Sequence, residues 1–118
     1  MAVDAALAAR VRALLADRND VAEKRMVGGL SFVVGGHLCV GVSGDALLVR
    51  VGPDAYKATL DESGVRPLAM GRKHPVGYVL VAGGTITTGD ELRAWIERGL
   101  AFVATLPPRA RARSQAAG

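Results

Sequence analysis

Three side chains in this 118-residue sequence have the chemistry of nucleophiles, bases or metal ligands: Cys39, His37 and His74. A cysteine becomes nucleophilic when a helix N-terminus or neighbouring cations lower the pKa of its thiol. Cys39 instead stands between Leu38 and Val40 in a predicted strand. The three residues also lack the CxxC and HxxxH spacings that are typical of zinc sites. We expect Cys39 to be a small buried hydrophobe and His37 a residue beside a turn, and we predict no catalytic residue, no cofactor and no metal site.

Neither the carboxylates nor the glycine pairs suggest an enzyme. The acidic residues fall in predicted turns and at helix ends, where capping explains them. Gly28-Gly29 and Gly83-Gly84 do not fit GxGxxG or GxxxxGK[ST], so both pairs are predicted turns rather than phosphate-binding loops. We therefore predict that the protein is not an enzyme.

The basic residues suggest anion or nucleic-acid binding, with a solvated loop and a solubilising tail as the alternatives. The formal net charge is +4, but without the three tail arginines 12 basic and 11 acidic residues remain, a net charge of +1. Three charges give weak, nonspecific nucleic-acid binding through counterion release, and no aromatic residue lies between them for stacking. The guanidinium of Arg72 and the ammonium of Lys73, in the loop after Gly71, could bind a phosphate or a carboxylate. The candidate contacts are Arg50, Arg72, Lys73, Arg109, Arg111 and Arg113.

Length and composition indicate one soluble globular domain. Half of the residues are hydrophobic and 22% are charged, as in ordinary globular proteins. No apolar run reaches the roughly 20 residues that span a bilayer, and the N-terminus does not resemble a signal peptide. A single cysteine cannot form an internal disulfide, so a cytoplasmic location is expected. We predict a domain over residues 1–108 and a disordered basic tail over 109–118.

The pattern along the chain predicts an α+β fold. Asp4 can cap a helix over residues 4–17, and a short helix is expected over 55–62. Thr88 and Glu91 have capping-box spacing at the start of a long last helix, which Pro107-Pro108 should stop. Between the helices, about five to six strands are expected in an antiparallel sheet. The predicted extended segments are 23–27, 30–34, 37–42, 46–51, 65–68 (an edge strand) and 77–82.

The clearest hairpin has Gly35-Gly36 as its turn, and it predicts which side chains share a face. Opposite residues in an antiparallel pair point to the same side of the sheet, so Val33 should lie beside Leu38. The predicted core face, covered by the last helix, then contains Val33, Leu38, Val40, Val42, Leu47, Val49 and Val51. The second face contains Cys39, His37 and Arg50 together with the apolar residues Leu30, Phe32, Val34 and Leu48. Those four apolar side chains need a cover, and the candidates are the N-terminal helix, a second copy of the chain or, third, a ligand.

The chain also resembles a known family. Six segments are similar to the N-terminal domain of TfoX/Sxy proteins. They are Lys24-x-Met26-x-Gly28-Gly29, Gly41-Val42, Leu47-Leu48-Val49-Arg50-Val51, Val65-Arg66-Pro67-Leu68, Gly77-Tyr78-Val79 and Trp95…Leu106-Pro107-Pro108. The resemblance covers residues 4 to 108. It implies a bent antiparallel sheet with helices, similar to secretion-chaperone domains, which often pair. It also implies a non-enzymatic module, since family members include regulators of natural competence that carry a second domain.

Together these observations predict a small cytoplasmic module that forms a homodimer, with Leu30, Phe32, Val34 and Leu48 at the interface. A protein partner in transcriptional regulation is the expected further contact. The alternative is a nucleic-acid-associated accessory protein that uses the arginine tail and the Arg72-Lys73 loop.

Overall fold

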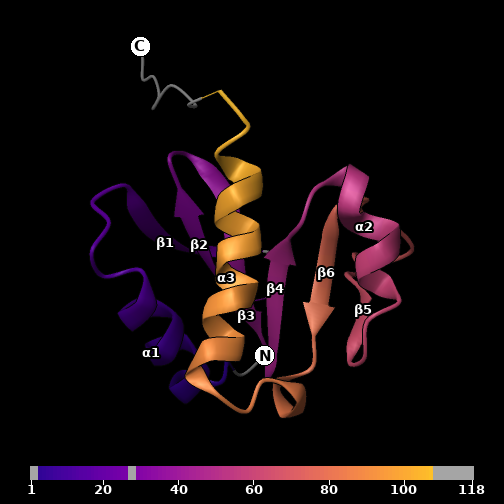
Figure 1. Cartoon of the computed structure of the whole chain (residues 1–118), viewed down its shortest axis with the longest axis horizontal. Coiled ribbons are helices and arrows are strands. Elements are labelled where there is room, and N and C mark those ends of the chain that lie inside the picture. The colour runs from indigo at the N-terminus through magenta and orange to yellow at the C-terminus, as the bar shows by residue number, and fades with distance from the viewer. Residues whose placement is uncertain (1–2, 27–28, 108–118) are drawn as a thin grey trace.

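The structure, a computed structural model, describes residues 3–26 and 29–107. Figure 1 shows an antiparallel sheet with helices packed on one side of it. The helices are α1 (Ala5–Leu14), α2 (Pro53–Leu60), the short 3-10 turn η1 (Gly83–Thr85) and α3 (Gly89–Val103). The strands are β1 (Val21–Met26), β2 (Gly29–Val34), β3 (His37–Ser43), β4 (Ala46–Arg50), β5 (Val65–Pro67) and β6 (Tyr78–Val81). The predicted α+β class and its three helices are confirmed.

Local sequence signals explain where these elements begin and turn. The Asp4 carboxylate accepts hydrogen bonds from the first backbone amides of α1. At α3, Thr88 accepts from the Glu91 amide at 3.1 Å and the Glu91 carboxylate accepts from the Thr88 amide at 3.1 Å, which completes the predicted capping box. Gly35 and Gly36 have φ angles of 59° and 86°, as a primed two-residue turn requires. The long helix ends at Val103, a turn before the prolines that were predicted to stop it.

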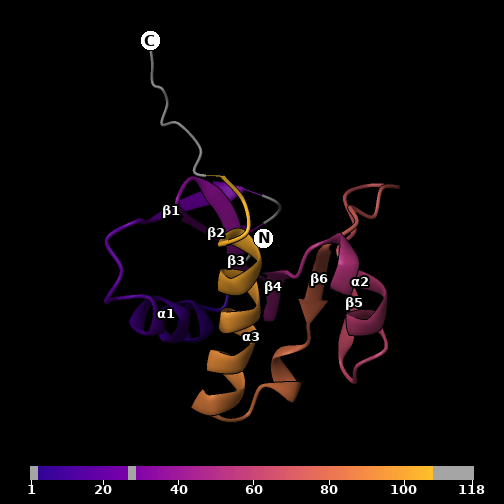
Figure 2. The same cartoon turned by 45° about the horizontal axis from the view of Figure 1, so that its top comes forward.

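The strand order is β1-β2-β3-β4-β6-β5, and every neighbouring pair is antiparallel. β5 is an edge strand, as the proline in its sequence predicts. β6 pairs with β4 across a long connection, and this register places Tyr78 opposite Arg50. Figure 2 shows the sheet bending around α3.

One irregularity between β2 and β3 makes part of the predicted face assignment wrong. Val33 pairs with Leu38 as expected, but Phe32 pairs with Val40, so Cys39 is the extra residue of a β-bulge. A bulge shifts the alternation of side chains by one residue. Val33 and Leu38 therefore lie on the second face, whereas Cys39 packs into the main core.

The bulge also moves three of the four predicted interface residues. Leu30, Phe32 and Val34 lie on the helix-covered face and belong to the main core cluster or pack against it. Leu48 lies on the second face as predicted, but there it is buried against Leu68 and Leu80 of the same chain. The four apolar side chains that motivated a dimer are thus packed against other residues of the same chain.

The main core lies between the sheet and all three helices. Leu7 and Val11 of α1 and Leu92 and Ile96 of α3 contribute to it, and α2 packs against its margin. The opposite face carries no helix in the described chain and is partly covered by the segment that follows β5. Within that described part, no helix is long and apolar enough to cross a membrane.

Candidate ligand site on the helix-free face

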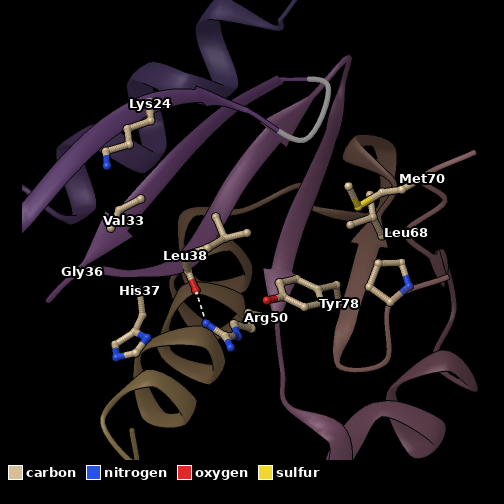
Figure 3. Close-up of a pocket in the computed structure, with 10 residues that line it drawn as sticks. Lys24, Val33, Gly36, His37, Leu38, Arg50, Leu68, Met70 and Tyr78 are labelled. Atoms are coloured by element: carbon tan, nitrogen blue, oxygen red, sulfur yellow. Dashed lines mark hydrogen bonds between the residues drawn. The ribbon is translucent and has the colours of Figure 1, made fainter. Parts of the chain in front are cut away.

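A cavity of about 580 Å³ opens on the helix-free face of the sheet, between the β2–β3 hairpin and the segment that follows β5. Figure 3 shows the side chains that line it. A volume of this size is within the range of small-ligand sites. Its lining residues are Lys24, Val33, Gly36, His37, Leu38, Arg50, Leu68, Met70, Pro75 and Tyr78.

Arg50, at the end of β4, is the central polar group of the cavity. Its guanidinium carbon lies 5.2 Å from the centroid of the Tyr78 ring and 5.3 Å from that of the Phe102 ring. These cation–π contacts hold the planar group in place. Its Nη1 donates to the backbone carbonyl of Leu38 at 3.4 Å. The half-buried guanidinium is therefore oriented by three neighbours before any ligand arrives.

Two glycines let the chain bring these partners together. The Val51 and Gly52 amides donate to the Gly77 carbonyl at 2.8 and 3.1 Å, which joins the end of β4 to the start of β6. Gly52 has a φ of 88°, and a Cβ there would overlap the Phe102 ring. A side chain at position 52 would push away the ring that contacts Arg50.

The charge of the cavity is positive. Lys24, His37 and Arg50 line it, and no acidic residue does so among the described residues. The ion pairs of the described chain engage other arginines: Arg12 with Glu23, Arg18 with Asp20, and Arg98 with Glu62. The guanidinium of Arg50 thus has no carboxylate partner in the described structure. His37 donates from Nε2 to the Pro107 carbonyl at 2.6 Å, because a carbonyl can only accept.

Most of the other side chains that line the cavity are apolar. In Figure 3, Leu68 and Met70 lie beyond the Tyr78 ring, and Leu38 lies between them and Val33. The Tyr78 hydroxyl is directed toward the side of Leu38 and Arg50. The cavity therefore places the Arg50 guanidinium beside apolar surface, which is the pattern of a site for an amphipathic anion.

The structure brings only part of the predicted basic cluster together. Arg50 lines the cavity, whereas Arg72 and Lys73 are exposed at the tip of the loop and are not among the lining residues. His74 is exposed in the same loop, far in sequence from Cys39. Arg109, Arg111 and Arg113 lie outside the described residues. No group of His, Cys, Asp and Glu that could hold a metal occurs within residues 3–26 and 29–107.

Cys39 lies on the other side of the sheet from the cavity, fully buried in the main core. Burial raises the pKa of its thiol from 9.0 to about 12, since a thiolate loses its hydration there. The Arg18 and Arg50 charges oppose this shift only partly. The thiol is therefore protonated at neutral pH.

We predict that folded protein resists alkylation of Cys39 by iodoacetamide at pH 7.5. Because the pKa is raised on folding, the stabilisation from the neutral thiol is complete below about pH 9 and is lost as the pH rises toward 12. Mass spectrometry over time should show that Cys39 is modified no faster than the whole protein unfolds. Protein unfolded in urea is the control, and it should be labelled rapidly. Fast labelling of the folded protein would contradict this burial.

Several lining residues carry no signal in the sequence. Leu38 faces the cavity because of the bulge, which no residue type in the sequence predicts. Tyr78 reaches Arg50 because β6 pairs with β4, two strands that are not consecutive. Arg50 itself was among the predicted anion contacts, but the sequence grouped it with Arg72 and Lys73 instead of with two aromatic rings.

Comparison with protein families gives a match that covers most of the chain. Residues 13–103 match the model of the TfoX N-terminal domain. The match includes the whole sheet and all of α3, together with every residue that lines the cavity. No curated protein and no solved structure matches the chain. On the basis of the family match, the protein belongs to the TfoX N-terminal domain family.

Proposed function

We propose that this protein is a small, cytoplasmic, non-enzymatic interaction module with a regulatory role, and that it forms a homodimer through the helix-free side. The observation that carries the proposal is the position of its exposed hydrophobic residues. Met70 and Val76 are the exposed large hydrophobics of the described chain, with 49% and 60% of their surface accessible, and both lie in the loop that walls the cavity.

The loop is well placed to present these side chains. Met70 and Lys73 exchange two backbone hydrogen bonds, of 2.8 and 3.0 Å, which close a turn at its tip. Leu68 anchors one end of the loop against Leu48 and Leu80. Exposed apolar groups that lie together mark contact sites, and Met is enriched in interfaces.

The surroundings of the reactive side chains support a binding role in preference to a catalytic one. The Cys39 thiol is fully buried on the far side of the sheet, and the Nε2 atom of His37 is engaged by the Pro107 carbonyl. Nucleophilic catalysis needs an accessible nucleophile with a base within hydrogen-bond reach. Recognition at the helix-free face needs neither group.

We expect size exclusion with light scattering, at tens of micromolar protein, to give twice the chain mass. The substitution Val76→Glu should yield a monomer, because a carboxylate would have to be buried at the interface. Ala94→Glu, an exposed change on α3, is the matched control and should leave the dimer intact. A monomeric wild-type protein would rule out the homodimer.

The alternative partner is nucleic acid, and the exposure of Arg72 and Lys73 is what favours it. If it applies, full-length protein will shift DNA in a gel at low salt, and the shift will weaken steeply as salt is added. Loss of that shift in a chain truncated after Leu106 would assign the binding to the arginine tail. The absence of any shift at low salt would leave the protein-interaction proposal alone.

A further inference from the structure

We infer that the cavity on the helix-free face binds a small amphipathic carboxylate, with its carboxylate on Arg50 and its apolar body against Leu38, Leu68 and Met70. This inference deepens the proposed binding role of that face and rests on it. Its ligand is a small molecule, distinct from the second copy of the chain that the loop would contact.

The anion-binding end follows from the state of Arg50. A guanidinium offers five N–H donors in a planar fork that matches a carboxylate. In the described structure only Nη1 has a hydrogen-bond acceptor, the Leu38 carbonyl, at the long distance of 3.4 Å. The Tyr78 and Phe102 rings contact the group at 5.2 and 5.3 Å and so fix its plane. Holding the group in advance lowers the entropy that a ligand must overcome.

The number of available donors favours a singly charged headgroup. A phosphate monoester carries up to two charges and three oxygens, and sites for it usually gather several donors. Here the His37 Nε2 donor is already used by the Pro107 carbonyl at 2.6 Å. In Figure 3, Lys24 lies at the far side of the cavity from Tyr78. One guanidinium with a nearby phenol suits a carboxylate better than a phosphate.

The apolar end follows from the other lining residues. Leu38, Leu68, Met70 and Pro75 form this part of the wall, and Met70 is accessible from solvent. No acidic side chain lines the cavity among the described residues, so nothing there repels an anion. A chain or ring attached to the carboxylate can therefore reach apolar surface, and each buried methylene should strengthen binding by about fourfold.

The test uses straight-chain carboxylates as probes with the full-length protein. We expect hexanoate, octanoate and decanoate to shift the amide resonances of Leu38, Arg50 and Tyr78 in heteronuclear NMR titrations, with affinity rising along the series. Octanol and octylamine have the same chain without the negative charge, and both should bind at least tenfold more weakly than octanoate. Octyl phosphate should also bind more weakly, and tighter binding of it would contradict the assignment to carboxylates.

Variants locate the site. Arg50→Gln should weaken octanoate binding about tenfold or more, whereas Arg66→Gln should not change it. Arg66 is a matched control because it is exposed on the same face, in β5, and does not line the cavity. Met70→Asp, at a half-exposed position, should weaken octanoate binding through charge repulsion and provides a second variant if Arg50→Gln unfolds.

Equal binding by the Arg50→Gln and Arg66→Gln proteins, or no resonance shift up to millimolar octanoate, would overturn the inference. Light scattering separates this failure from failure of the proposed homodimer. If the protein is a monomer that binds octanoate, the ligand site is supported and the homodimer is ruled out. If it is a dimer that binds no carboxylate, the homodimer is supported and the ligand site is ruled out.

Discussion

Replacing Phe32 by alanine should lower the free energy of unfolding by about 3–5 kcal/mol, the usual result of deleting a buried aromatic ring. Phe32 is fully buried in the main core, on the face that the helices cover. Its ring lies on the same face as Val40, its partner across the bulge. Domains usually have a total stability of only about 5–15 kcal/mol, so this one substitution should remove a large share of it.

Leu38→Ala is the control that makes the Phe32 result decisive. Regular alternation through the hairpin predicts Leu38 on the main core face and Phe32 on the second face, and the structure reverses the two. Leu38 is only half-buried, beside the cavity, so its truncation should cost about 1 kcal/mol or less. Urea unfolding followed by Trp95 fluorescence and far-UV circular dichroism measures both. A larger loss for Leu38→Ala than for Phe32→Ala would show that the bulge is wrongly placed.

This pair of residues also shows what the sequence can and cannot predict. The turn at Gly35-Gly36, the Asp4 cap and the Thr88–Glu91 capping box depend on neighbouring residues alone, and all were predicted correctly. Alternation was also correct from Val40 to Val49, where the hairpin is regular. It failed at Cys39 and at the residues before it, because an inserted strand residue changes the face of everything beyond it. Valine, leucine and cysteine can lie on either face of the sheet, so these residue types do not indicate the bulge.

The cavity was harder to predict than the fold for a related reason. Arg50 is visible in the sequence as a cation near the end of a strand, but its partners come from three distant segments. Tyr78 arrives through the pairing of β6 with β4, and Phe102 arrives from the end of α3. No local pattern joins residues that are 28 and 52 positions from Arg50 in the numbering. Composition indicated a positive charge, and only the tertiary structure shows where that charge meets apolar surface.

The second large effect is expected at Gly99, in the middle of α3. A Cβ at this position would lie 3.0 Å from the Cys39 carbonyl oxygen, 3.1 Å from its Sγ and 3.1 Å from a Val40 methyl carbon. The helix therefore crosses the sheet directly over the bulge, at a distance that leaves little room for any side chain. Gly99→Leu should lower the free energy of unfolding by at least about 2 kcal/mol and the melting temperature by roughly 8 °C or more. Ala101→Leu, at an exposed position of the same helix, should change the stability by no more than about 0.5 kcal/mol.

Gly99→Ala tests the contact more finely, because two effects oppose each other. Alanine favours the helix over glycine by about 0.5–1 kcal/mol, whereas its methyl group would press on the bulge. If the contact with Sγ matters, Gly99→Ala should destabilise the wild-type protein more than it destabilises a Cys39→Ala background, where that atom is absent. The difference is the coupling energy of a double-mutant cycle, which residues in direct contact show and distant ones do not. Additive effects of Gly99→Ala and Cys39→Ala would show that the Sγ atom does not limit the approach of α3, and would leave the Cys39 carbonyl oxygen and the Val40 methyl group as the atoms that require glycine there.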